Sequence, residues 1–184
     1  IFCTASIIPV CIMRAAAPMI TEVHYINVFY ILKKVPLGFF GHLTAGLILG
    51  AFYAIGPIFA KTSGFTLMQI SLVMSITILG EMALQWPIGK LSDLFQRRHI
   101  IIADCIGLFM VSCVLAFAPN LSFNLLLVLL FIFGGFAFTI YPLNITYTCD
   151  FFSSSGITAV TAAALLIFGF GCIIGPSVAP FFIE

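Results

Sequence analysis

The residue with the clearest chemical potential is Glu81, a carboxylate inside a long apolar stretch. Thr77, Glu81 and Gln85 recur every four residues, so on a helix they form one polar stripe. A carboxylate in hydrocarbon costs on the order of several kcal/mol unless it is protonated, paired or in contact with water. We therefore predict either a site that binds a proton or a polar solute, or a protonated glutamate that is hydrogen-bonded between helices.

A second set of polar and small residues shares one face of the apolar stretch at residues 37–60. The set is His42, Gly46, Gly50 and Tyr53. Tyr53 either faces a solute or belongs to an aromatic belt at a membrane interface. Glycines four residues apart let another helix approach closely, so we interpret Gly46 and Gly50 as packing residues. We expect His42 to be a hydrogen-bonded or interfacial residue rather than a proton relay.

Residues 85–98 form the one strongly polar and cationic segment between two apolar stretches. Pro87 and Gly89 predict that the preceding helix, which starts near residue 65, ends there. The segment carries four charged residues, which are Lys90, Asp93, Arg97 and Arg98.

The acidic residues near this segment are expected to meet its cations. Asp93 is placed to cap a helix end or to pair with a cationic side chain. Asp104 follows Arg97 by seven residues, so we expect it to pair back to Arg97 or Arg98. A further polar stripe, at three-residue spacing, ends the apolar stretch at residues 121–147 and consists of Tyr141, Asn144, Tyr147 and Asp150. Taken alone, this stripe is typical of an interfacial aromatic girdle closed by a helix-ending aspartate.

Composition places the chain in a membrane. Apolar residues make up 62% of the 184 residues, the mean hydropathy is +1.26 and only 7% of residues are charged, whereas a soluble domain carries about 25%. The apolar stretches are continuous rather than alternating, which favours helices over strands. No basic stripe with interleaved aromatic residues is present to bind nucleic acid. The six cysteines are dispersed without a C-x-x-C pair, and there is no nucleotide-binding loop, so we predict no metal site and no cofactor.

The predicted fold is an all-α bundle of about five complete membrane-spanning helices, since about 20 apolar residues cross a bilayer. The predicted spans are residues 37–60, 65–88, 99–118, 121–147 and 156–183. Residues 1–13 are too few to span and are interpreted as the end of a truncated helix. Residues 14–36 are mixed and predict a connecting loop that can include an amphipathic helix on the membrane surface. Residues 37–184 then form the five-helix transmembrane part.

Lysine and arginine are distributed unevenly between the two sides of these spans. Lys61 is on one side, and the other six cations are on the opposite side: Arg14, Lys33, Lys34, Lys90, Arg97 and Arg98. Because short cytoplasmic loops are enriched in cations, we expect residues 14–36 and 89–98 to be cytoplasmic.

The cationic segment resembles the G-x-L-x-D-r-x-g-r-k loop motif of major facilitator superfamily (MFS) transporters. The matching residues are Gly89, Leu91, Asp93, Arg97 and Arg98. Two positions depart from the motif, because Leu94 stands where the family has Arg and Gln96 where it has Gly. The flanking Gln-Trp-Pro-Ile-Gly and Leu-Ser-Asp resemble a bacterial subgroup, which implies a bacterial inner membrane.

The resemblance implies a partial MFS fold. A complete carrier of this family has twelve helices in two six-helix halves. This chain resembles the end of helix six, the central loop and helices seven to eleven, so the N-terminal six-helix half would be a missing partner. The resemblance further implies a secondary active transporter that moves a small solute by alternating access.

The resemblance also implies roles for particular residues. Gly89, Asp93, Arg97 and Arg98 would form a conformational latch. By the same analogy a cavity wall would include the stripe of Tyr141, Asn144, Tyr147 and Asp150. The other candidates for a cavity or proton site are Glu81, Gln85 and Tyr53, and these follow from the residues themselves, since the resemblance implies a small residue at position 81. The chain also resembles the family in a glycine–proline pattern found in helices with a packing and gating role. The matching residues are Gly171, Gly175 and Pro176.

Two other classes of function are open. A non-transporting membrane subunit, or the remnant of a broken transporter gene, would have the same spans without transport. An intramembrane enzyme would need a nucleophile and a base at matching depths, and the sequence has no G-x-S-x-G. We therefore predict that the chain is not an enzyme.

Overall fold

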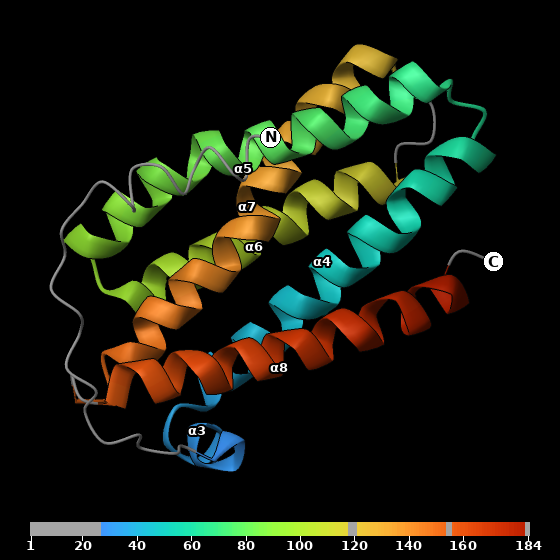
Figure 1. Ribbon diagram of the computed structural model, residues 1–184. Coiled ribbons are helices and arrows are strands. Elements are labelled where there is room, and N and C mark those ends of the chain that lie inside the picture. The colour runs from blue at the N-terminus through green and yellow to red at the C-terminus, as the bar shows by residue number, and fades with distance from the viewer. Residues whose placement is uncertain (1–26, 118–120, 154–155, 183–184) are drawn as a thin grey trace, which may run out of the picture.

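Every regular element in the described part of the chain is a helix. The computed structural model describes residues 27–117, 121–153 and 156–182 (Figure 1). The elements are α3 (Val28–Lys34), α4 (Pro36–Thr62), α5 (Leu67–Leu94), α6 (Arg97–Phe117), α7 (Phe123–Cys149), α8 (Ile157–Val178) and the 3-10 helix η2 (Ala179–Phe182). The five helices α4 to α8 are each long and apolar enough to cross a membrane. The predicted all-α bundle with five spans is confirmed.

The short helix α3 occupies the described part of the predicted connecting loop. The side chain of Asn27 caps it by accepting a hydrogen bond from the backbone N–H of Phe29 at 3.1 Å. The fully buried Ile31 packs α3 against α8, and α3 also contacts α4. The truncated helix predicted at residues 1–13 lies outside the described residues.

The second span is longer than the sequence predicted. Helix α5 passes through Pro87 and Gly89 and ends at Leu94, so the prediction that these residues end the helix is wrong. A proline removes only one backbone donor, and an apolar environment favours keeping all the other hydrogen bonds of the helix. Only Phe95 and Gln96 separate α5 from α6. The cationic segment is therefore mostly helix.

The turn between α4 and α5 has clear local signals. Gly64 has a φ of +84°, a left-handed conformation that glycine adopts without steric cost. Thr66 and Gln69 then form a capping box, in which each side chain accepts a hydrogen bond from the backbone N–H of the other residue, at 3.4 and 2.9 Å. These two features define where α5 begins.

Helix α7 is central in the bundle. It packs against α5, α6 and α4, and α8 packs mainly along α4 (Figure 1). A buried apolar cluster joins α4, α6 and α7, and consists of Ala45, Leu108, Ala137, Phe138 and Ile140. Many large apolar side chains point outward instead, and Met82, Phe109 and Leu165 are each more than half exposed. Exposed apolar side chains of this kind are expected of helices that face lipid.

Two helix pairs approach so closely that their backbones touch. Between α5 and α7, a Cβ atom on Gly80 would overlap the carbonyl oxygen of Phe131, and one on Gly134 would overlap that of Thr77. Between α4 and α8, a Cβ atom on Gly46 would lie 3.0 Å from the Cα atom of Gly171. Small residues at such crossings are a common means of helix association in membranes.

Candidate functional site

Arg97, the first residue of α6, joins the ends of three helices. Its Nη2 atom lies 3.4 Å from Oδ1 of Asp93 in the last turn of α5. Its Nε atom lies 3.0 Å from Oδ2 of Asp150, which directly follows α7. A guanidinium group presents several donors in a fixed plane, so one arginine can hold two carboxylates. The ends of α5, α6 and α7 are therefore tied together at one side of the bundle.

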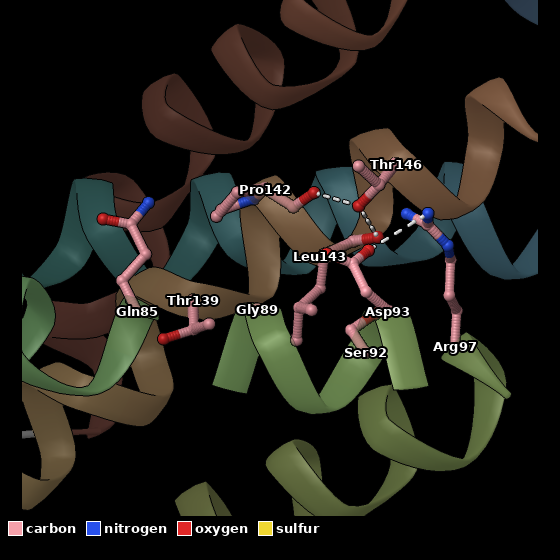
Figure 2. Close-up of a pocket in the computed structure, with 9 residues that line it drawn as sticks. All are labelled: Gln85, Gly89, Ser92, Asp93, Arg97, Thr139, Pro142, Leu143 and Thr146. Carbon is pink, nitrogen blue, oxygen red and sulfur yellow. Dashed lines mark hydrogen bonds and ion pairs between the residues drawn. The ribbon is translucent and has the colours of Figure 1, made fainter. Parts of the chain in front are cut away.

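A hollow of about 150 Å³ opens beside this ion-pair cluster. Most of its lining comes from α5 and α7, and the lining residues are Gln85, Gly89, Ser92, Asp93, Arg97, Thr139, Pro142, Leu143 and Thr146 (Figure 2). Figure 2 shows Gln85 at one end of the hollow and the Asp93–Arg97 pair at the other. The hydroxyl of Ser92 is buried, and within the described residues it has no hydrogen-bond partner.

Three of the four predicted latch residues meet at this hollow. Gly89, Asp93 and Arg97 line it, whereas Arg98 points elsewhere and is exposed. The side chain of Asp93 is 71% exposed although it is paired, while that of Arg97 is only 26% exposed. Asp93 therefore has surface free to meet a further partner.

The pairing expected of Asp104 is wrong. Asp104 is 3% exposed on α6, and neither of its carboxylate oxygens has a hydrogen-bond partner within the described part of the chain. Seven residues along a helix correspond to about 10 Å, which separates Asp104 from the start of α6. Arg97 pairs with Asp93 and Asp150 instead, because their helix ends meet its own.

The predicted cavity residues do not form one site. Glu81 is half-buried on α5 and lies within electrostatic range of Tyr53 on α4. Tyr53 is 45% exposed, and its ring centroid is 5.5 Å from that of Phe138 on α7. Gln85 lies one turn beyond Glu81 and lines the hollow beside the ion pairs.

Tyr141 and Asn144 of α7 face α4 and α8 rather than Glu81. The ring centroid of Tyr141 lies 5.6 Å from that of His42 and 4.5 Å from that of Phe168. Asn144 is fully buried, and its Nδ2 donates a hydrogen bond to the carbonyl of Ile140 at 2.8 Å. Its Oδ1 atom has no partner among the described residues.

A buried hydrogen bond joins α4 to α7 beside Asn144. Oγ1 of Thr148 lies 3.3 Å from Nε2 of His42, and both side chains are fully buried. The Thr148 hydroxyl donates to the carbonyl of Asn144 at 2.7 Å, so its oxygen is left to accept from the Nε2–H of His42. A Cβ atom on Gly38 would overlap this hydroxyl, so the glycine makes room for the contact. His42 is thus hydrogen-bonded, as expected.

The family model for the Major Facilitator Superfamily matches residues 12–183. The chain belongs to the Major Facilitator Superfamily. It is 30% identical over 146 aligned residues to the uncharacterized MFS-type transporter YcaD of Escherichia fergusonii. The alignment covers 79% of the chain and 37% of that relative. It is also 28% identical over 180 aligned residues to YcaD of Salmonella arizonae. This alignment covers 94% of the chain and 44% of that relative. No solved structure matches the chain at a significant level.

The family resemblance inferred from the cationic segment is confirmed. The family model is that of the Major Facilitator Superfamily, and the curated relatives that match this multi-pass chain are named MFS-type transporters. The chain spans less than half the length of the curated relatives that it matches. Within the described residues, no group of three or more His, Cys, Asp and Glu side chains is arranged to hold a metal ion.

Several residues that shape this MFS chain did not stand out in the sequence. Asp150 was predicted as the last residue of a polar stripe, and its ion pair with Arg97 was not expected. Thr148 lies among other polar residues and gave no signal of its contact with α4. The sequence contained only a weak signal of the close contact at Gly80 and Gly134. A glycine inside an apolar span is a candidate for helix packing, but the sequence does not say which helix it contacts.

We expect Thr148→Val to lower the free energy of unfolding by about 1 kcal/mol. Valine keeps the shape of threonine but removes the oxygen that meets Nε2 of His42. Leaving a buried donor unsatisfied costs about 1–3 kcal/mol, and interhelical hydrogen bonds in membranes average about 0.6 kcal/mol. Denaturant or thermal unfolding of the purified protein in detergent measures the change.

Thr146→Val is the matched control for this prediction. The Thr146 hydroxyl is exposed and bonds only to carbonyls of its own helix, those of Pro142 and Leu143. Its loss should change stability by less than about 0.5 kcal/mol. Equal effects of the two variants would show that the His42 contact adds nothing to stability.

Proposed function

We propose that the chain is part of a secondary active transporter that moves a small solute across a membrane by alternating access. The observation that carries the proposal is the match of the MFS family to residues 12–183, a range that includes all five apolar helices. On this proposal the solute or its coupling proton contacts the candidate cavity residues Glu81, Gln85, Tyr53, Tyr141 and Asn144.

The complete carrier would contain a second helical half. The matches cover 37% and 44% of two curated relatives. On the resemblance of the cationic segment, the chain would supply the end of helix six and helices seven to eleven. The missing N-terminal six-helix half would be its partner. In this family architecture a solute site lies between the halves, near the middle of the membrane.

The ion-pair cluster would serve as a conformational latch. Arg97 binds carboxylates at the ends of α5 and α7, while Gly89 leaves the hollow open beside Asp93. Asp93 is 71% exposed and could meet a helix N-terminus of the other half, where a carboxylate is stabilised by the helix dipole. Arg98, which has no ion pair within the described residues, would hold a carboxylate or a lipid phosphate in one state of the cycle.

The close contact of α4 with α8 would have a packing and gating role. Gly46 meets Gly171, and Gly50 lies against the backbone of Cys172. Gly175 lies against the carbonyl of Leu47 and precedes Pro176 within α8. Smooth backbone surfaces of this kind let two helices slide without side-chain interlocking.

We also propose a bacterial inner membrane with residues 14–36 and 89–98 in the cytoplasm. The relatives YcaD come from bacteria. In the structure Lys34 and Arg98 line one hollow, so cations that precede α4 and cations that start α6 gather at one end of the bundle. Cations of this kind favour the cytoplasmic side.

A solute screen on vesicles that hold the complete carrier tests the transport proposal. At least one small solute should cross the vesicle membrane only when the carrier is present and should accumulate against its own gradient when an ion gradient is imposed. Passive equilibration of every tested solute, with and without the carrier, would contradict secondary active transport.

For the latch, we expect Asp93→Asn in the complete carrier to cut the rate of solute transport about tenfold, the equivalent of one charged hydrogen bond. Asparagine keeps the size of the side chain but removes the charge that meets Arg97. The amount of carrier in the membrane should stay unchanged. Transport rate per carrier molecule is the measurement.

Lys90→Gln is the control for Asp93→Asn. Lys90 lies in the same helical turn region of α5, over the ring of Trp86 at 5.4 Å, and does not line the hollow. Its loss should leave transport within about twofold of the parent. Unchanged transport by Asp93→Asn would remove the latch role.

A further inference from the structure

A second hollow, of about 240 Å³, lies between the start of α4, the start of α6 and the end of α7. We call it the Lys34–Arg98 hollow, and its lining residues are Lys34, Val35, Pro36, Leu37, Arg98, Tyr147 and Phe151. It shares no lining residue with the hollow beside Asp93. Its volume is large beside the roughly 15 Å³ that one water molecule needs.

The two cations of this hollow have no acidic partner among the residues that the structure describes. Lys34 places its Nζ atom over the ring of Phe152, 4.2 Å from the centroid, and makes no ion pair within the described residues. Arg98 is exposed and likewise makes none in the described part of the chain. The acid nearest in sequence to this lining, Asp150, has its Oδ2 atom 3.0 Å from Nε of Arg97 and is thereby engaged. Within the described part of the chain, the hollow therefore has two positive charges from two different elements without an acidic partner.

The rest of the lining suits an amphipathic ligand. Val35, Pro36 and Leu37 supply apolar surface, and the half-buried Tyr147 supplies a phenolic hydroxyl with no hydrogen bond among the described residues. The ring of Tyr147 packs edge-to-face against the ring of Phe151, with 5.1 Å between their centroids. Phosphate oxygens accept hydrogen bonds from lysine, arginine and hydroxyl donors alike.

Exposed aromatic residues on α3 and the first turns of α4, the elements that supply Lys34, Pro36 and Leu37 to the lining, favour a lipid as the source of the phosphate. Tyr30 is 50% exposed, and its ring centroid is 5.7 Å from Nζ of Lys34. Phe29 is 67% exposed and Phe40 is 55% exposed. The hollow itself lies where α4 begins and α7 ends, and spanning helices begin and end at the level of the lipid headgroups. Aromatic side chains are enriched at that level, and basic pockets between spans bind anionic headgroups there.

We propose that the Lys34–Arg98 hollow binds the phosphate of an anionic phospholipid headgroup. Lys34 and Arg98 contact the phosphate oxygens, Tyr147 donates its hydroxyl to them, and the exposed aromatic residues contact the glycerol and upper acyl chains. The site shares Arg98 with the proposed latch, so that part of the inference rests on the proposed function, but its lining includes none of the candidate cavity residues and lipid binding is measured without transport.

Lipid binding to the purified chain in detergent tests this proposal. The probes are short-chain phosphatidylglycerol, the matching phosphatidylcholine and inorganic phosphate, and retained lipid is measured by native mass spectrometry. Phosphatidylglycerol should bind more tightly than the other two probes. Arg98→Gln and Lys34→Gln should each weaken its binding about fivefold, and the double variant about twenty-fivefold, since each cation near an anionic lipid contributes about 1 kcal/mol.

Three matched variants control for folding and for general charge. Lys34→Arg and Arg98→Lys keep the charges and should retain binding within about twofold. Lys90→Gln removes a cation of the same end of the bundle outside the hollow, and should also leave binding within about twofold. Equal weakening by Lys90→Gln would overturn the proposal in favour of general charge attraction. Equal binding of phosphatidylcholine would overturn the role of the two charges, and equally tight binding of inorganic phosphate would overturn the lipid assignment.

Discussion

Replacing Gly80 by leucine is expected to prevent α5 from packing against α7 and to lower the free energy of unfolding by at least about 3 kcal/mol. A side chain at this position would overlap the carbonyl oxygen of Phe131, which belongs to a backbone and cannot rotate away. The two helices must separate, and the contact of Gly134 with Thr77 is then lost as well. Because folded proteins are stable by only about 5–15 kcal/mol, this loss is a large share of the total.

Gly89→Leu on the same helix is the matched control for Gly80→Leu. A Cβ atom on Gly89 would meet no atom within 4 Å. Leucine also has a higher helix propensity than glycine by close to 1 kcal/mol, so this variant should be as stable as the parent or slightly more stable. Thermal unfolding in detergent, followed by size-exclusion chromatography, compares the two variants. Similar stability of both would show that α5 and α7 are not in backbone contact at Gly80.

The second large effect is expected of Glu81→Gln in the complete carrier, and it rests on the proposed transport function. Glutamine keeps the size and the hydrogen-bonding capacity of glutamate but cannot take up and release a proton. Accumulation of solute driven by a pH gradient should therefore be abolished, while exchange of solute for solute should continue. Counterflow and pH-driven uptake in the same vesicles measure the two activities.

Asp104→Asn is the matched variant for Glu81→Gln, because Asp104 is a buried acid inside another span. Asp104 is 3% exposed and lies on α6, whereas Glu81 lies on α5. Asp104→Asn should keep pH-driven accumulation. Equal loss of accumulation and exchange in Glu81→Gln would indicate a role in packing or solute binding instead, and loss of accumulation in Asp104→Asn alone would move the coupling site to α6.

Several features of the chain were readable from its sequence because they depend on local physics. The five spans follow from the length and continuity of the apolar stretches, since a bilayer requires about 20 apolar residues in a row. The turn at Gly64 and the start of α5 at Thr66 follow from short-range backbone and capping preferences. The family resemblance depended on residues of one short segment, Gly89 to Arg98. Their spacing belongs to the sequence and does not depend on how the helices pack.

The prediction that Pro87 and Gly89 end the second span was wrong, and the reason is also physical. Pro87 and Gly89 weaken a helix in water, where the freed backbone groups can bind solvent. In an apolar environment every unpaired backbone group costs several kcal/mol, so a helix that reaches Pro87 within the membrane keeps its remaining hydrogen bonds there, and α5 then continues to Leu94. The rule that proline and glycine end helices is a local one, whereas the position at which α5 ends also depends on the environment of the helix.

What only the tertiary structure decided is which helix touches which. Arg97 pairs with Asp150 rather than with Asp104, because the end of α7 lies beside the start of α6. Glu81 lies within electrostatic range of Tyr53, while Asn144 lies in a separate polar cluster with His42 and Thr148. Membrane helices have similar apolar surfaces, so hydropathy does not distinguish one neighbour from another, and the choice is made by the few small and polar residues at each crossing. Those contacts join residues far apart in the chain, where spacing along the sequence carries no information about distance in space.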